Sequence, residues 1–319
     1  MILPSARPSK GDSLQSLSVV VPVYGQREAL MTHIQHHRAL YEGCGETIWV
    51  ATPSTDCAHQ LARQSAERFG GAYVELGPGL YEAWNSGISR ATKKWVYLNT
   101  TGDFVDLQRL QKLLSMASLA MADVAFTPPD QKESVGDLRQ WPILKHASSL
   151  RPWNQAIVPS RLMIRLQLLA GDSNLLGSLA GGLFSVALLQ KFPFPTDFKS
   201  FGDTAWTFAH CGTARFFYSS TSIASFLSHD ASRTAIHPRD TGRLLRLLAS
   251  TAPNPVQTAI LGSIHRYLLC RRTLNWARGP RPGKKWLFSV KAWGLRLRRQ
   301  KAFADMSKLI LDSLAPRST

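Results

Sequence analysis

The sequence has few cysteines, few acidic residues and no long apolar run. Its cysteines, Cys44, Cys57, Cys211 and Cys270, stand far apart and form no CxxC pair. That spacing excludes a disulfide-rich scaffold and a cysteine-ligated metal site, and it favours a reducing compartment. No apolar stretch reaches the roughly 18 residues that a membrane-spanning helix requires. Residues 1–16 lack the apolar centre of a signal peptide, so we expect a flexible leader on a cytoplasmic protein.

The acidic residues are scarcest near the C-terminal end. The 319 residues carry 38 Lys and Arg against 21 Asp and Glu, a net charge of +17. Residues 1–235 hold 21 basic and 18 acidic side chains, whereas residues 236–319 hold 17 basic and 3 acidic. The apolar content of 44% is ample for a folded core, so the body is predicted to be globular and nearly neutral. The positive charge belongs to a basic extension.

In the basic extension, Trp276, Trp286 and Trp293 lie among Arg, Lys and Leu, which is typical of helices at a membrane interface. Each cation near an anionic lipid surface is worth about 1 kcal/mol. We therefore expect residues 236–319 to bind an anionic membrane surface, on the inner face of the cell membrane. A helical extension docked on the body is the alternative. Nucleic-acid binding is disfavoured, because no base-reading or stacking motif accompanies the charges.

Short β-branched runs alternate with helical patterns through the first 130 residues. This alternation predicts an α/β fold with a mostly parallel sheet flanked by helices. Because Pro22 has no backbone N–H, we expect central pairing of the first strand to stop there. Strands are predicted at 17–24, 46–51, 71–76, 94–98, 123–127, 216–218 and 223–227, and helices at 28–40, 58–69, 81–92, 107–120, 161–170, 181–191 and 204–211.

Ligands of such sheets bind where loops leave the carboxyl ends of the strands. The chemistry is therefore expected in the loops that follow the first, second and fourth strands, at 24–27, 52–56 and 100–103. These loops contain Ser54, Asp56 and Asp103, polar side chains that could serve a nucleotide and a metal ion.

Three segments are similar to glycosyltransferase family 2, nucleotide-sugar transferases of the GT-A fold. They are SVVVPVYGQREAL at 18–30, WVATPSTD at 49–56 and GLYEAWNSGISRATKKWVYLNTTGD at 79–103. The third matches the family pattern without a gap and is the specific one. The similarity covers residues 17–130 and continues loosely to 233 through FGDTAW and FLSHDASRT.

The resemblance implies a Rossmann-like, mostly parallel sheet divided by function. Residues 17–127 would bind the donor, and residues 128–235 would bind the acceptor and carry catalysis. Residues 236–319 lie outside the resemblance, and their charge and helical patterns predict a basic helical tail. The implied reaction transfers a sugar from a nucleotide-sugar, with a UDP-sugar as the expected donor, to a glycan or lipid-linked acceptor with inversion.

The resemblance also implies residue roles. Asp103 would hold a divalent cation, Mg²⁺ or Mn²⁺, on the leaving diphosphate, with His229 as a further metal contact. Asp203 would be the general base for the acceptor hydroxyl. Helix capping by either aspartate, or a plain loop histidine at 229, are the structural alternatives. The nucleotide-sugar would be bound by Pro22, Val23, Tyr24, Ser54, Asp56, Gly79, Tyr81 and Asn85; for Tyr81 and Asn85, packing of their helix on the sheet is the alternative.

The sequence departs from the family in three places. Ala51 stands where the family has an aspartate that reads the uracil edge, Gly25 stands where asparagine is usual, and TTGD holds a single acid. Loss of a base-pairing carboxylate relaxes base selectivity or weakens donor binding by about 1–3 kcal/mol. A second hypothesis therefore stays open, a non-catalytic transferase-like module tethered by its basic tail to a membrane or a partner.

Overall fold

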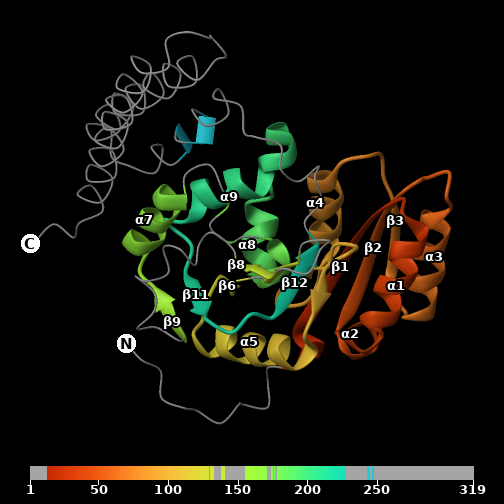
Figure 1. The fold of residues 1–319 in the computed structure, drawn as a ribbon, viewed down its shortest axis with the longest axis horizontal. Helices are drawn as coiled ribbons and strands as arrows, with labels where there is room; N and C mark the ends of the chain where they lie inside the picture. The colour runs from red at the N-terminus through yellow and green to blue at the C-terminus, as the bar shows by residue number, and fades with distance from the viewer. Residues whose placement is uncertain are drawn as a thin grey trace, which may run out of the picture.

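The computed structural model is built on an eight-stranded sheet in the order β3-β2-β1-β4-β10-β6-β11-β9 (Figure 1). It describes residues 13–128, 130–132, 138–140, 155–170, 174, 176, 178–227, 243–244 and 246–247. Six strands share one direction, whereas β10 and β9 run antiparallel to their neighbours. The strands are β1 (Leu17–Tyr24), β2 (Glu46–Thr52), β3 (Ala72–Glu75), β4 (Trp95–Leu98), β6 (Val124–Phe126), β9 (Gln155–Val158), β10 (Gly182–Ser185) and β11 (Phe216–Ser219).

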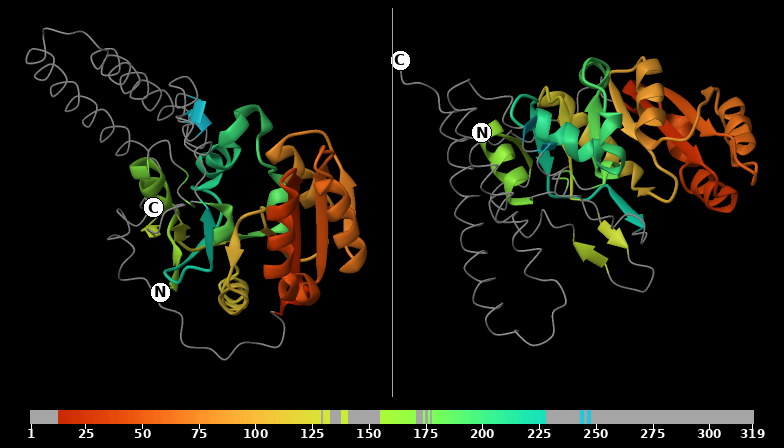
Figure 2. Two further views of the ribbon diagram at one scale, coloured as in Figure 1. Left: turned by 45° about the vertical axis from the view of Figure 1, so that its right-hand side comes forward. Right: turned by 90° about the horizontal axis from the view of Figure 1, so that it is seen from above.

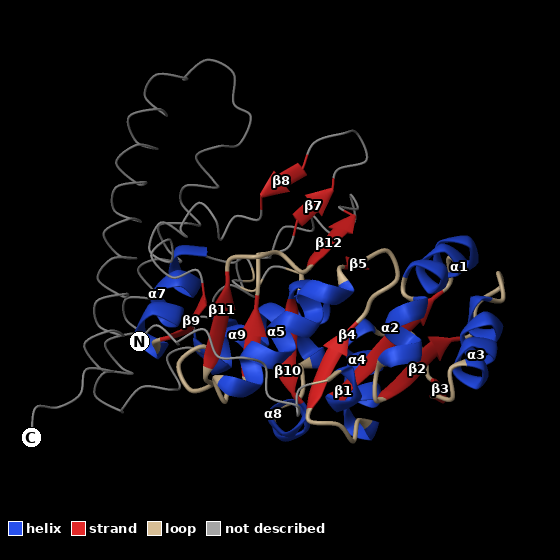
Figure 3. Ribbon diagram, turned by 90° about the horizontal axis from the view of Figure 1, so that it is seen from below, coloured by secondary structure: helices blue, strands red, loops and turns tan. Residues whose placement is uncertain are grey.

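Helices cover both faces of this sheet and make a three-layer α/β architecture, so the predicted fold class is confirmed (Figures 1 and 3). The alternation of side chains along each strand divides the core in two. Val20 and Val96 face one layer, while Val19 and Trp95 face the other. The first layer contains α4 (Leu80–Arg90), α7 (Ser160–Ala170), α8 (Val186–Lys191) and α9 (Gly202–His210); the second contains α1 (Arg27–His36), α2 (Arg38–Gly43), α3 (Ala58–Arg68) and α5 (Leu107–Leu119).

Pro22 marks the place where β1 changes partners. β1 pairs with β4 only as far as Val20, but it pairs with β2 to its last residue, Tyr24. The absent N–H of Pro22 therefore ends pairing on the β4 side only, and the expectation that central pairing would stop there is wrong for the β2 side. On the α4 face, Gly87 lets that helix approach closely, because a Cβ atom there would collide with Val20.

Two predicted helices take a different form. The helix expected at 28–40 is broken at His37 into α1 and α2. The helix expected at 181–191 is strand β10 followed by the short α8. Leu183 and Phe184 of β10 are fully buried between β4 and β6. A central strand covered on both faces is apolar throughout and lacks the alternation that marks a strand, so its sequence resembles that of a helix.

A second sheet of four short strands stands beside the first, in the order β5-β12-β7-β8. Figure 3 shows it extending away from the main sheet on the side where β4 ends. It joins the stretch directly after Asp103 to segments much later in the chain, since β5 pairs with β12. Its strands are β5 (Phe104–Val105), β7 (Asp130–Lys132), β8 (Leu138–Gln140) and β12 (Ala224–Leu227). Among the described residues, 3-10 turns lie at Leu14–Ser16, Leu179–Gly181 and Thr196–Phe201.

Strands β3, β2, β1 and β4 of the predicted donor half lie at one end of the main sheet, drawn red to orange in Figure 2, whereas β6 of the same half lies between β10 and β11. The green to cyan elements that follow residue 155 occupy the other end. Of the basic extension, only residues 243–244 and 246–247 are among those described. Arg243 forms an ion pair with Asp197, and Leu244 is buried in the α4–α9 core. Within the described residues, no helix has the length and apolarity to cross a membrane.

Candidate functional site

The loops after β1 and β2 are tied together by one carboxylate. Asp56 accepts hydrogen bonds from the backbone N–H groups of Arg27 (3.0 Å) and Ala58 (3.1 Å), and from the Ser54 hydroxyl (2.7 Å). These bonds, that of Ser54 first, lower the pKa of Asp56 to about 2. Asp56 therefore stays ionised and caps the first turns of α1 and α3. The structure brings the predicted Ser54 and Asp56 together, in a structural role.

The end of β1 presents one exposed ring beside buried strand residues. Pro22 and Val23 are buried, whereas Tyr24 is 72% exposed. Ala51 lies opposite Val23 on β2 and is itself fully buried in the core under α1 and α3. A nucleotide at this edge would therefore meet the Tyr24 ring and backbone groups, with no carboxylate at position 51.

The loop after β4 presents Asp103 at the same edge. A turn is closed by the Asp103 N–H, which donates to the Thr100 carbonyl at 3.0 Å. Gly102 has φ +97°, the left-handed conformation that the third position of a type II turn requires. The side chain is partly buried, and burial raises the pKa of Asp103 to about 8, with the backbone of Thr100 offsetting part of that rise. A positive charge nearby would favour the ionised carboxylate.

Helix α4 points two of the predicted residues at the later half of the chain. Gly79 precedes its first turn with φ +156°, and a Cβ atom there would collide with Glu82. One turn apart, Tyr81 and Asn85 share a face, as predicted. Asn85 bonds the backbone of Phe194 twice, donating to its carbonyl at 2.7 Å and accepting from its N–H at 3.0 Å. Both the NH₂ group and the oxygen of the Asn85 side-chain amide therefore hold the segment that leads to α9.

Asp203 opens α9 and lies at the centre of a polar cluster. Its carboxylate accepts hydrogen bonds from the Tyr81 hydroxyl (2.9 Å), the Asn174 amide (2.8 Å) and the Thr204 backbone N–H (2.7 Å). Burial nevertheless raises its pKa above the ordinary value, because these donors only partly offset desolvation. A raised pKa suits a carboxylate that takes a proton near neutral pH. The preceding Gly202 is required, since a Cβ atom would press on the Tyr81 ring.

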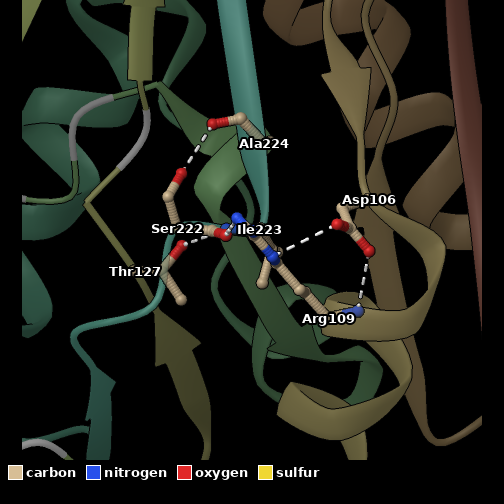
Figure 4. Close-up of polar contacts among 6 residues, drawn as sticks. All are labelled: Asp106, Arg109, Thr127, Ser222, Ile223 and Ala224. Atoms are coloured by element: carbon tan, nitrogen blue, oxygen red, sulfur yellow. Dashed lines mark hydrogen bonds and ion pairs between the residues drawn. The ribbon is translucent and has the colours of Figure 1, made fainter.

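The start of β12 is anchored to the main body through backbone groups, as Figure 4 shows. Arg109, which also pairs with Asp106, donates to the Ser222 carbonyl at 3.0 Å, and the Ile223 N–H donates to the Thr127 hydroxyl at 3.3 Å. A pocket of about 360 Å³ lies here, between β5, the first turn of α5 and β12. Its walls include Phe104 and Asp106, and the anchored β12 in turn pairs with the strand that follows Asp103.

At the carboxyl edge of the main sheet, Asp103 is the side chain that fits a divalent cation. Asp103 supplies a hard oxygen ligand, and Mg²⁺ or Mn²⁺ is commonly bound by one or two carboxylates together with substrate phosphates. Among the residues that the structure describes, no group of three His, Cys, Asp or Glu side chains converges as a metal site. The donor set therefore fits a cation whose remaining ligands come from a diphosphate. His229 lies outside the described residues.

Several residues of these clusters carry no recognisable sequence signal. Asn174 holds Asp203, yet nothing in its surroundings, GDSNLL, distinguishes it from a surface asparagine. Phe194 contributes only backbone atoms to Asn85. His37 and Tyr41, from the α1–α2 segment, contact the loop that carries Asp103. The sequence pointed to them only through a helical pattern in which His33 and His37 are four residues apart.

No protein-family model and no curated protein matches this sequence. Solved structures do match it. Residues 1–349 of TarS from S. aureus, in complex with UDP or with UDP-GlcNAc, superpose with a TM-score of 0.57 at 17% identity, covering 92% of this chain and 90% of TarS 1–349. The mannosyltransferase PcManGT from Pyrobaculum calidifontis, in complex with GDP-Man and Mn²⁺, gives a TM-score of 0.50 at 14% identity, covering 97% and 88%. The chain has their fold. At these identities the likeness shows the fold alone.

Proposed function

We propose that this protein is a glycosyltransferase that moves a sugar from a nucleotide-sugar to a hydroxyl of a glycan or lipid-linked acceptor. The observation that supports this proposal best is the placement of two aspartates, Asp103 and Asp203, on this fold. Asp103 follows β4 at the carboxyl edge, and Asp203 is held at the start of α9 by Tyr81 and Asn174. Burial raises the pKa of both carboxyls, as is common for groups with a chemical role.

The donor would lie across the ends of β1, β2 and β4. The exposed Tyr24 ring offers a stacking surface for the base, while Pro22, Val23, Ser54, Asp56 and Gly79 shape the loops around it. UDP is the expected nucleotide, in keeping with the UDP-GlcNAc bound by TarS; the GDP-Man of PcManGT is the alternative. Because Ala51 offers no carboxylate to a base, selectivity between uracil and guanine would be weak.

In the proposed reaction Asp203 takes the proton of the acceptor hydroxyl as its oxygen attacks the anomeric carbon. The bond from that carbon to the diphosphate oxygen breaks, and the nucleoside diphosphate leaves with the bonding electron pair. Attack opposite the leaving group inverts the anomeric centre. A divalent cation bound at this edge would neutralise charge on the leaving diphosphate, and Asp103 would hold it, with His229 as a candidate second ligand. Tyr81 keeps Asp203 oriented throughout.

Residues 236–319 would place the enzyme on an anionic membrane surface, where lipid-linked and cell-surface glycans are assembled. Their net charge of +14 and their tryptophans support that proposal. Of the described residues of the extension, Arg243 contacts Asp197 and Leu244 is buried in the core, so these two pack on the body. Docking and membrane binding are compatible if the packed part is short.

A non-catalytic binding module is the second candidate, and Ala51 is the observation that favours it. A degenerate transferase could keep the fold and lose donor binding.

The test is hydrolysis of a panel of UDP- and GDP-sugars with Mn²⁺, comparing the wild type with Asp103→Ala and Asp203→Asn. We expect slow, metal-dependent release of nucleoside diphosphate from one donor, diminished at least a hundredfold in both variants. A wild type that neither binds nor hydrolyses any donor of the panel would contradict the transferase proposal.

A further inference from the structure

Three aromatic side chains form a column along α1 and α2, beneath the loop that carries Asp103. His33, His37 and Tyr41 are spaced four residues apart and are each 2% exposed. The ring centroids of His33 and His37 lie 4.2 Å apart, and those of His37 and Tyr41 lie 6.1 Å apart. A helix kink at His37 lets the column continue from one helix to the next. Such spacing places the three side chains on one face.

His37, the middle residue of this column, contacts the far end of the loop. Its Nε2 accepts a hydrogen bond from the backbone N–H of Val105 at 3.3 Å, two residues after Asp103. The proton of the neutral ring is therefore on Nδ1, which donates to the His33 carbonyl at 2.8 Å. Phe104 completes the contact, with its ring stacked on His37 at 6.4 Å and edge-on to His36 at 5.2 Å.

Tyr41 holds the other end of the same loop. Asn99 directly follows β4, and its side-chain NH₂ donates to the Tyr41 hydroxyl at 2.9 Å. The Tyr41 ring is itself fixed between Trp49 and Phe69, at centroid distances of 5.0 and 5.3 Å. Asn99 is fully buried, so this bond is shielded from water and geometrically defined.

Between these two anchors the loop has few bonds of its own. The Asp103 N–H closes the turn on Thr100, but the buried Oδ1 of Asn99 and Oγ1 of Thr101 have no hydrogen-bond partner in the part of the chain that the structure describes. The ends of the turn are held by backbone bonds, from the Asn99 N–H to the Val20 carbonyl and between β5 and β12, and by the side chains of His37 and Tyr41.

We propose that His37 and Tyr41 are positioning residues that hold the Asp103 carboxylate in place for a metal-bound nucleoside diphosphate. The identity of the ligand rests on the proposed function. The two bonds that His37 and Tyr41 make to the loop do not depend on it. Neither side chain is required to touch the donor. His37 acts through the backbone N–H of Val105 and Tyr41 through the side chain of Asn99, one on each side of Asp103, and the loss of either lets the turn shift.

The test combines two variants with a rescue. His37→Phe preserves the ring and removes the bond to Val105, whereas His37→Gln offers an amide oxygen at the place of Nε2. Tyr41→Phe removes only the hydroxyl that accepts from Asn99. Trp95→Phe is the matched control, since it removes a buried side-chain bond, Trp95 Nε1 to Ser118 at 2.9 Å, at the opposite end of β4.

The first readout is hydrogen–deuterium exchange of the segment 99–106, which needs no ligand. We expect faster exchange in His37→Phe and Tyr41→Phe, near-wild-type exchange in His37→Gln, and no change in this segment in Trp95→Phe. The second readout is calorimetric binding of UDP or GDP with and without Mn²⁺. We expect affinity in Mn²⁺ to fall about tenfold in the Phe variants at 37 and 41, with metal-free affinity unchanged and the Gln variant restored.

The outcomes separate the two levels of the proposal. Unchanged exchange in the variants at 37 and 41 would overturn the anchoring itself. Faster exchange with unaltered Mn²⁺-dependent affinity would leave these residues a purely structural role and overturn the positioning. If the wild type binds neither UDP nor GDP, the proposed function fails and positioning for a nucleoside diphosphate fails with it, while the exchange result still decides the anchors.

Discussion

Two carboxylates at opposite ends of the central strands have opposite surroundings. At the amino end, Glu46 accepts hydrogen bonds from Ser18 (2.5 Å), from Thr92 N–H (2.6 Å) and hydroxyl (2.9 Å), and from Lys93 N–H (3.2 Å). Burial alone would raise its pKa, but these bonds outweigh burial and lower it. At the carboxyl end, burial dominates and raises the pKa of Asp103 to about 8. Hydrogen bonds therefore outweigh burial at Glu46, whereas burial outweighs hydrogen bonding at Asp103.

The difference between the two carboxylates indicates that Glu46 stabilises the fold, whereas Asp103 is the candidate for a chemical role. Glu46 ties the start of β2 to the residues before β4, so its bonds act on folding. Asp103 contributes little to folding in its ionised form, because its desolvation is poorly compensated. Local rules of polar satisfaction are commonly broken at functional sites and obeyed elsewhere.

The largest expected effect is that of Asp103→Asn. The amide keeps the shape and removes a buried acid, so the thermal unfolding temperature should stay the same or rise, while metal-dependent donor hydrolysis falls at least a hundredfold. Calorimetry and product assays on the same preparation measure both. A marked loss of stability would show that Asp103 is a structural residue after all.

At the other edge Glu46→Ala should do the reverse. It leaves the Thr92 N–H and the Ser18 hydroxyl without their acceptor and removes one of the two acceptors of the Lys93 N–H, and we expect a loss of about 2–3 kcal/mol in the free energy of unfolding. Urea unfolding measures this change. Hydrolysis measured well below the unfolding temperature should stay within twofold of the wild type; a large drop would contradict the division between the edges.

Tyr81→Phe is expected to have an intermediate effect. Its hydroxyl donates to Asp203 and lowers the pKa of that carboxyl, so its removal raises the pKa further. Since a base must be unprotonated, the acid limb of the pH–rate profile should move to higher pH, with a rate loss of about tenfold at neutral pH. An unmoved limb would argue that Asp203 does not act as the base.

Asp56→Asn should have the smallest effect, and a pH-dependent one. Because the folded-state pKa is depressed to about 2, the ionised form stabilises the fold above the ordinary pKa near 3.8, and that contribution disappears as the pH falls towards 2. The variant should be slightly less stable than the wild type at pH 7 and equal to it near pH 2. Chemical denaturation at both pH values checks the sign.

The sequence predicted most of the strands and helices between residues 17 and 127, because these elements follow strong periodic patterns. The places of Asp103 after β4 and of Asp203 at the start of α9 also came from the sequence. It misplaced β10, whose apolar residues are buried on both faces and show no strand period. It could not reveal the bonds of Asn174 or Tyr41, since these join residues far apart in the chain through single side chains.

The central claim is that the carboxyl edge binds a nucleoside diphosphate through a cation held by Asp103. Its most direct test is calorimetric titration of UDP and GDP, with Mn²⁺, into the wild type, Asp103→Asn and Glu46→Gln. The account predicts one binding site in the wild type and in Glu46→Gln, and loss of the Mn²⁺-dependent part of the affinity in Asp103→Asn. Equal Mn²⁺-dependent binding by Asp103→Asn, or no binding of either nucleotide by the wild type, would contradict it.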